Sequence, residues 1–343
     1  MRKRRLFVLT ALLVVVLALG YANRASVRNL WDQVTGADFA GGGHGSVTLV
    51  IHPGETGTDV ANALVKADIV KSFHIVYGLL IARNQTFYPG TYSMRLEMSS
   101  LSALTALGDE RNRISEVVVI KEGYRLSNTF SALSAATGIS VSQFQQTAAD
   151  LGAIGVPSGE VSAEGWLFPA TYSFDPSQSA LQMLAAMVDR TKQELRRYSV
   201  PAAQWHRVLT LASVVQKEGR QTPDFYKISR VFLNRIAAGM NLQSDATVSY
   251  GVSGNTVSTS AADRASANGY NTYLHAGLPI GPISAPGSIA IDAALHPAEG
   301  KWLYFCAINL ATGETVFSET YAQHEVAVKQ WQAWMRANPG YGG

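Results

Sequence analysis

A glutamate closes a mostly apolar helical segment in the second half of the chain. The segment LASVVQKEG covers residues 211–219, and apolar residues lie three, four and seven positions before Glu218. This spacing places Glu218 on the apolar side of a helix, in its last turn, with Gly219 as a left-handed cap. Apolar surroundings and the negative end of the helix dipole both raise the pKa of a carboxyl group. A glutamate that stays protonated near neutral pH can act as a general acid.

A second interpretation of Glu218 involves no chemistry. An exposed glutamate beside Lys217 could close a surface helix, because charged residues are mostly found at solvated surfaces. The residue types of this segment alone leave both interpretations open.

Polar residues that could hold a substrate follow in two segments. Residues 240–252, MNLQSDATVSYGV, alternate in polarity, and residues 270–288 form a polar loop with three prolines. A stiffened polar loop of this length inside a compact domain is usually functional. Asp245 has a structural alternative, in which it caps a turn or pairs with Arg235. The candidates for substrate binding are Gln243, Asp245, Thr247, Tyr250, Asn271 and Tyr273.

Apolar spacing predicts the helices and strands that must position these residues. Residues 47–52 alternate as a strand, and Thr58 caps a first helix. A second helix begins near Ser72, and residues 88–94 return as a strand. Residues 115–136 repeat the opening order of strand, glycine turn at Gly123 and helix, and further helices are predicted at 141–150, at 178–198, from Pro201 and from Thr222. The mixture predicts an α+β protein.

The aromatic segment EGWLFPATYSF, residues 164–174, has two interpretations. Flat apolar rings could line a groove for sugars, because such faces suit pyranose rings. The same rings could belong to the hydrophobic core, which is the more common place for large aromatic side chains.

The N-terminus combines positive charge with an apolar run. Four basic residues at positions 2–5 precede residues 6–22, which are 17 residues without a charge. A run of about 17–25 apolar residues can span a bilayer, and preceding basic residues favour a cytoplasmic N-terminus. The alternative is a cleaved signal peptide, because Gly20 and Ala22 would suit a signal peptidase. In both interpretations, the rest of the chain is exported across the membrane.

Composition argues against several classes of function. The net charge of +3 comes from the N-terminus, since the rest of the chain has 24 of the 28 basic residues against 25 acidic ones. That balance gives no electrostatic basis for nucleic-acid binding. The seven histidines include no HExxH motif, so we expect neither a metal nor a cofactor. Cys306 is the single cysteine, which excludes an internal disulfide, and WLYFCAINL predicts that it lies in a buried strand.

Ordered motifs over nearly the whole chain resemble the YceG-like family, which contains the endolytic murein transglycosylases of the MltG type. The motifs are EGWLFPATY, LASVVQKEG, VFLNRI, GMNLQSDATVSYG, YNTY, GLPIGPI, HPA, LYF and FSETYAQH. The resemblance implies residues 1–5 as a cytoplasmic tail, 6–22 as a transmembrane anchor, 23–46 as a linker, 47–110 as a LysM-like module, 111–335 as the catalytic domain and 336–343 as a C-terminal tail.

The same resemblance implies a role for Glu218. The catalytic acid of the family is the glutamate of the KE pair, which falls on Glu218. The expected reaction is a non-hydrolytic cut between N-acetylmuramic acid and N-acetylglucosamine within glycan strands, which leaves 1,6-anhydro ends. Positions that depart from the family pattern are Ala170, Gln216, Ala246, Ala285 and Thr315. None of these departures removes the acid.

The resemblance also implies a location in the cell and binding partners. The protein is expected in the inner membrane as a single-pass protein with its catalytic body outside the cytoplasm, where it would limit the length of new strands. Its expected partners are peptidoglycan strands and the peptidoglycan synthases. Two alternatives without catalysis are a tether that binds the wall and a scaffold for wall-synthesis enzymes.

Overall fold

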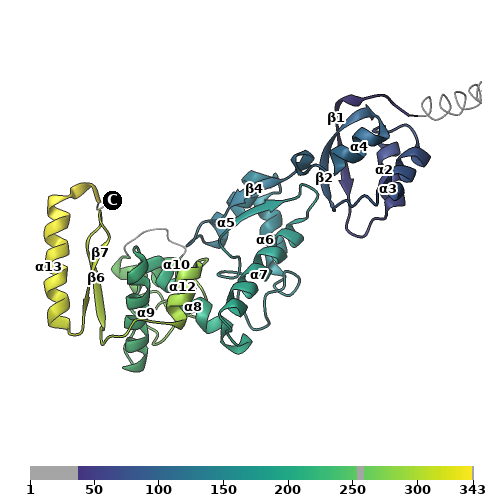
Figure 1. The fold of residues 1–343 in the computed structure, drawn as a ribbon. Helices are drawn as coiled ribbons and strands as arrows, with labels where there is room; N and C mark the ends of the chain where they lie inside the picture. Colours follow the sequence, from purple (N-terminus) through teal and green to yellow (C-terminus); the bar gives the residue numbers. More distant parts are fainter. Residues whose placement is uncertain (1–37, 253–258, 342–343) are drawn as a thin grey trace, which may run out of the picture. The chain divides into compact units, whose positions relative to one another are not determined.

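The computed structural model describes residues 38–252 and 259–341, which form two compact units (Figure 1). The first unit contains the described residues up to Ser115 together with Asp175–Ser177, and the second contains the remainder. The predicted membrane anchor at residues 6–22 lies outside the described residues. Within the described part of the chain, no helix has the length and apolar character needed to cross a membrane.

The first unit is a three-stranded antiparallel sheet with helices. The sheet has the order β1-β2-β3, with Thr48 opposite Ser93 between its first two strands. Its elements are β1 (Gly42–Ile51), α2 (Gly57–Lys66), α3 (Phe73–Ala82), β2 (Gly90–Met98), α4 (Ser100–Leu107), the 3-10 turn η1 (Glu110–Asn112) and β3 (Arg113–Ile114). The order strand, helix, helix, strand is as predicted. Strand β1 begins earlier than predicted, inside the stretch assigned as a linker.

The first helix of this unit begins at a different threonine from the predicted one. Thr56, not Thr58, is the N-cap of α2, and Thr56 and Asp59 form a reciprocal capping box. Val60 and Leu64 then turn inward and are fully buried. The capping box satisfies backbone N–H groups that the helix itself leaves unpaired.

The second unit has two small antiparallel sheets and is otherwise helical. The sheets pair β4 (Glu116–Val119) with β5 (Thr171–Phe174) and β6 (Tyr304–Asn309) with β7 (Glu314–Ser318). The helices are α5 (Leu126–Thr137), α6 (Val141–Ala149), α7 (Ala180–Arg197), α8 (Trp205–Glu218), α9 (Thr222–Ala237), α10 (Asp245–Gly251), α11 (Ala261–Arg264), α12 (Ser288–Leu295) and α13 (Tyr321–Ala337). Short 3-10 turns lie at η2 (Ala202–Gln204) and η3 (Pro339–Tyr341). The mixed α+β class is confirmed.

Helix α8 runs through the core of the second unit. Its apolar residues are buried from Trp205 to Val215, and it packs against α9, α10 and α12. The aromatic segment at 164–174 belongs to the same core, because Trp166 is completely buried and Leu167 nearly so. The core interpretation of that segment therefore holds.

Two local predictions, the cap at Gly219 and the buried strand at Cys306, differ from the structure. Gly219 has an extended backbone with φ of −75°, so it is not a left-handed cap. Glycine is required there for space, because a Cβ atom would lie 2.7 Å from the ring of Phe225. The second half of residues 240–252, which alternate in polarity, forms α10, whose buried side packs against α8. Strand β6 is only partly buried, and Cys306 with it.

Candidate active site

The side chain of Glu218 lines a cleft of about 670 Å³ within the second unit. The cleft lies where the end of α8 meets the segment before α10. It is lined by polar and charged residues together with a few apolar ones: Gly123, Arg125, Asn128, Lys217, Glu218, Arg220, Phe232, Arg235, Leu242, Gln243, Ser244, Asp245, Ala246, Ser249, Tyr273, Phe305 and His324. The carboxyl group of Glu218 is therefore reachable by a ligand, although the helix that carries it is a core helix.

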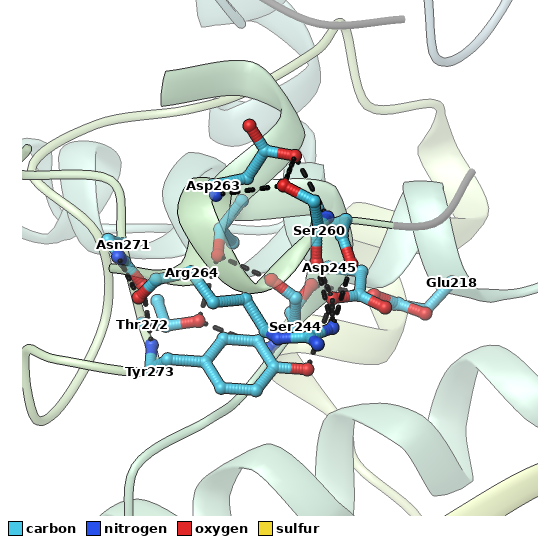
Figure 2. Close-up of polar contacts among 11 residues, drawn as sticks. Glu218, Ser244, Asp245, Ser260, Asp263, Arg264, Asn271, Thr272 and Tyr273 are labelled. Atoms are coloured by element: carbon cyan, nitrogen blue, oxygen red, sulfur yellow. Dashed lines mark hydrogen bonds and ion pairs between the residues drawn. The ribbon is translucent and has the colours of Figure 1, made fainter. Parts of the chain in front are cut away.

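The surroundings of Glu218 raise its pKa. Burial in the cleft is the largest cause, and the nearby negative charge of Asp245 adds to it. The Ser244 hydroxyl opposes the shift by donating a 2.6 Å hydrogen bond to Oε1 of Glu218, and Lys217 opposes it by its charge (Figure 2). The net direction is upward, which favours the protonated form that a general acid needs. Glu218 is thus not a solvated charge that closes a surface helix.

Ser244 is held in place by a second segment of the chain. Its backbone N–H donates to Oγ1 of Thr272 over 3.1 Å, and the N–H of Gln243 donates to the carbonyl of Thr272 over 3.0 Å. Oγ1 of Thr247 donates to the Ser244 carbonyl over 2.7 Å and lies 2.8 Å from Oγ1 of Thr272 (Figure 2). These buried bonds fix the direction in which the Ser244 hydroxyl points.

Asp245 is the second carboxylate of the cleft. Oδ1 of Asp245 accepts hydrogen bonds from the hydroxyls of Thr259 and Tyr273, the latter over 3.1 Å, and lies 3.9 Å from Nη1 of Arg264 (Figure 2). The guanidinium of Arg264 in turn covers the Tyr273 ring. Burial and then the Asp245 charge raise the pKa of Tyr273 to about 12, so its hydroxyl remains a donor.

Arg235 does not pair with Asp245, contrary to one sequence interpretation. Its guanidinium is buried and donates to backbone carbonyls, over 2.7 Å to Leu303 and 2.7 Å to Leu242. It also lies 5.2 Å from the centre of the Tyr304 ring. Arg235 therefore joins α9 to β6 and to the segment that leads to Ser244.

The predicted binding residues divide into two groups. Gln243, Asp245 and Tyr273 line the cleft, whereas Thr247, Tyr250 and Asn271 do not. Asn271 is fully buried, where its Nδ2 donates to the carbonyls of Arg264 and Ser266 and its Oδ1 accepts from the N–H of Tyr273. Thr247 is equally buried. These side chains shape the loops beneath the cleft.

Sequence reasoning missed Glu164. This residue begins the motif EGWLFPATY, but only its aromatic residues drew attention. Glu164 is almost completely buried, and burial raises its pKa to about 7. Its Oε2 accepts hydrogen bonds from the N–H of Leu126 over 3.1 Å and from the hydroxyl of Tyr250 over 3.2 Å. Glu164 thus joins the start of α5 to α10 behind the cleft wall.

Two positions that depart from the family pattern have structural roles here. The side-chain oxygen of Gln216 accepts a 2.9 Å hydrogen bond from the N–H of Gly287, which precedes α12. The backbone of Ala285 exchanges hydrogen bonds with Gly123 and Tyr124, over 2.8 Å and 2.7 Å. The first contact holds the start of α12 against the end of α8, and the second joins the segment before α12 to the loop before α5.

Comparison with known proteins finds relatives over most of the chain. The chain is 29% identical over 310 residues to an endolytic murein transglycosylase of Bacillus subtilis, covering 83% of this chain and 85% of that protein. It is 28% identical over 320 residues to an endolytic murein transglycosylase of Streptococcus pneumoniae, covering 81% of this chain and 57% of that protein. A YceG-like protein of Listeria monocytogenes has a similar crystal structure, with a TM-score of 0.55, 27% identity and coverage of 82% of this chain and 99% of that one. Residues 49–330 match the YceG-like family, and the chain belongs to that family.

Proposed function

We propose that this protein is an endolytic murein transglycosylase with Glu218 as its general acid and base. The observation that carries the proposal is the carboxyl group of Glu218, which faces a polar cleft of about 670 Å³, accepts a hydrogen bond from Ser244 and has a raised pKa. Relatives that bear the name of this activity match most of the chain. The substrate is the glycan strand of peptidoglycan.

The reaction needs one proton carrier. Glu218 donates its proton to the glycosidic oxygen that leaves N-acetylmuramic acid, and the acetamido group of the sugar stabilises the cation that develops. Glu218, now a carboxylate, takes the proton of the C6 hydroxyl while the oxygen of that hydroxyl bonds to C1. The acid is regenerated, no water is consumed and the new end is a 1,6-anhydro sugar. A hydrolase of the usual kind would need two carboxyl groups with separate roles.

The rest of the cleft holds the sugar in position. Gln243, Asp245 and Tyr273 line it and supply an amide, a carboxylate and a hydroxyl. Thr247, Tyr250 and Asn271 act through the loops that they brace. Asp245 is close enough to Glu218 to raise its pKa, and its negative charge would stabilise a positive charge that develops on a sugar bound beside Glu218.

The other parts of the chain place the enzyme at the wall. Residues 47–110 serve as a LysM-like module that binds glycan, which the order β1, α2, α3, β2 supports. Residues 6–22 anchor the protein in the inner membrane with residues 1–5 in the cytoplasm, as the basic quartet followed by an uncharged run favours. The catalytic body then acts outside the cytoplasm on strands made by peptidoglycan synthases, and it limits their length.

Digestion of uncrosslinked glycan in ¹⁸O-labelled water tests the proposal. The full chain in detergent should cut within the strands and leave 1,6-anhydro ends that contain no label, as read by mass spectrometry. Labelled reducing ends would mean hydrolysis. Retention of glycan without any cut would favour the tether or the scaffold.

A further inference from the structure

His324 lines the cleft from α13, the helix that contains the end of the motif FSETYAQH. None of the steps assigned to the acid uses this histidine. Its imidazole ring is stacked on the ring of Tyr304 in β6, with the ring centres 5.2 Å apart and an angle of 21° between the planes. The centre of the Tyr321 ring lies 6.2 Å from it. Two aromatic neighbours therefore hold the imidazole in one orientation.

The two nitrogens of the His324 ring have different surroundings. Nδ1 is buried. Neither nitrogen has a hydrogen-bond or ion-pair partner within residues 38–252 and 259–341. The side chain as a whole is only partly buried and lines the cleft, so Nε2 is the nitrogen that a ligand can reach.

These surroundings favour a neutral ring with its proton on Nε2. Buried N–H groups without a partner are rarer in proteins than acceptors without one, and a neutral imidazole has one N–H. The buried, unpaired Nδ1 is therefore the bare nitrogen. Burial and then the charge of Arg235 lower the pKa of His324, against an opposing effect of Glu325. His324 thus offers the cleft one N–H donor.

Buried contacts connect this donor to the acid. The Arg235 guanidinium lies 5.2 Å from the centre of the Tyr304 ring, on which His324 stacks. Arg235 also donates over 2.7 Å to the carbonyl of Leu242, in the segment that leads to Ser244. The hydroxyl of Ser244 in turn binds the carboxyl group of the acid. The donor and the acid are therefore parts of one braced framework.

Phe305 adds an apolar surface to the same cleft. It follows Tyr304 in β6, is partly buried and lines the cleft. Its ring packs edge-on against the ring of Phe232, with the centres 5.9 Å apart and an angle of 83° between the planes. A lone N–H donor and an apolar ring suit a group that combines an acceptor oxygen with a small apolar end. The acetamido group of an amino sugar has both, in its carbonyl oxygen and its methyl group.

We propose that His324 donates a hydrogen bond to the acetamido carbonyl of an N-acetylglucosamine beside the bond that is cut, and thereby positions the strand on Glu218. The proposal rests on the proposed function and extends it to one sugar. The acetamido group of the muramic acid is engaged at its own C1 during the reaction, which leaves that of the neighbouring sugar for the donor. Hydroxyl groups can donate as well as accept, so they would not require a donor of fixed direction.

The test compares two forms of one preparation of uncrosslinked glycan. The glucosamine residues are deacetylated enzymatically, with the muramic acid left intact, and their amines are then either acetylated again or thioacetylated. The thiocarbonyl keeps the approximate shape of the acetamido group, but its sulfur is a weaker hydrogen-bond acceptor than oxygen. The kcat and KM of both forms are measured with the parent, His324→Phe and His324→Gln.

The variants separate the ring from its N–H group. His324→Phe keeps a ring that can stack on Tyr304 and removes both nitrogens, so the protein should stay folded. His324→Gln keeps an N–H donor at a similar reach. His296→Phe is the matched control, because His296 is an exposed histidine of the same unit that does not line the cleft, and its pair with Asp292 lies at the surface. Melting temperatures check that each variant is folded.

The parent should cut the acetylated form with a kcat/KM about fivefold above that of the thioacetylated form, as expected for one neutral hydrogen bond. His324→Phe should lose this preference through a higher KM on the acetylated form, with kcat little changed, because the contact is made equally in the ground state and the transition state. His324→Gln should keep part of the preference, and His296→Phe should keep all of it.

Equal kcat/KM of the parent on both forms, with normal anhydro ends, would overturn the inference and leave the proposed function intact. A preference that survives in His324→Phe would also overturn it, because other residues would then distinguish oxygen from sulfur. Equal loss of the preference in His324→Phe and His324→Gln would assign the effect to the ring and not to its N–H group, with the same result. Failure of the parent to cut either form would instead remove the proposed function, and the inference with it.

Discussion

The Ser244 hydroxyl donates a 2.6 Å hydrogen bond to the Glu218 carboxyl group across 26 positions of the chain. The bond joins the last residue of α8 to the residue that precedes α10. It stabilises the ionised form of Glu218, while burial and Asp245 favour the protonated form. The pKa of Glu218 is therefore set by opposing contacts that can be removed one at a time.

Ser244→Ala should move the pH dependence of the reaction upward. Without this donor the pKa of Glu218 rises further, because the Ser244 bond lowers it. The acid must be protonated to start the reaction, so kcat/KM falls as pH passes the pKa of Glu218. The alkaline limb of the kcat/KM profile should therefore shift to higher pH. Ser229→Ala is the control, because the buried Ser229 hydroxyl has no hydrogen-bond partner among the described residues and should leave the profile in place.

Asp245→Asn should move the same limb in the opposite direction. The substitution keeps an oxygen that can accept from Thr259 and Tyr273 but removes the negative charge that raises the pKa of Glu218. The alkaline limb should shift to lower pH, and the rate at its plateau should also fall as expected for a residue that positions the sugar. A shift in the same direction as that of Ser244→Ala would contradict this electrostatic account.

Glu218→Gln should abolish most of the activity without unfolding the protein. The amide oxygen can still accept from Ser244, but the side chain can no longer deliver a proton. General acid–base catalysis contributes about 10²–10⁴-fold, so the appearance of anhydro ends should slow by at least that factor. Gln216→Glu is the control, because a carboxylate there can still accept the hydrogen bond from Gly287. Unchanged cutting by Glu218→Gln would place the acid elsewhere.

Gln243→Gly should separate stability from activity. Gln243 lines the cleft with φ of 51°, a left-handed conformation that costs free energy in any residue except glycine. Glycine relieves this strain but removes the side chain, so the melting temperature should hold or rise while kcat/KM falls. Gln243→Ala keeps the strain and removes the same amide. The two variants should therefore match in activity and differ in stability.

Glu164→Gln should remove part of the pH dependence of stability. The pKa of Glu164 is raised from 4.5 to about 7 in the folded protein, so its favourable contribution is complete below pH 4.5 and is lost as pH rises towards 7. The shift corresponds to about 3 kcal/mol of unfolding free energy. Denaturant unfolding of the parent and the variant should give similar values at pH 4, and the variant should be the more stable at pH 8.

Local sequence predicted the helix that carries Glu218 and most of the other elements. The apolar spacing of α8 depends only on neighbouring residues, so it predicted both the helix and the inward side of Glu218. The same holds for α7, which covers most of the predicted 178–198, and for α9, which begins at Thr222 as predicted. The ordered motifs identified the family, because several motifs in the same order along the chain are far more specific than a single residue.

Tertiary structure decided which polar side chains face the cleft. Thr247 and Asn271 had the residue types of binding groups, but both are fully buried in the structure. Oγ1 of Thr247 lies 2.8 Å from Oγ1 of Thr272, 25 positions away, and Asn271 donates to the carbonyls of Arg264 and Ser266. Ser244 and Glu164 drew no attention in the sequence, because their roles depend on partners that lie 26 and 38 positions away, at Glu218 and Leu126. The periodicity of a segment shows which side of it is apolar, whereas the partner of a buried polar group is set by the packing of distant segments.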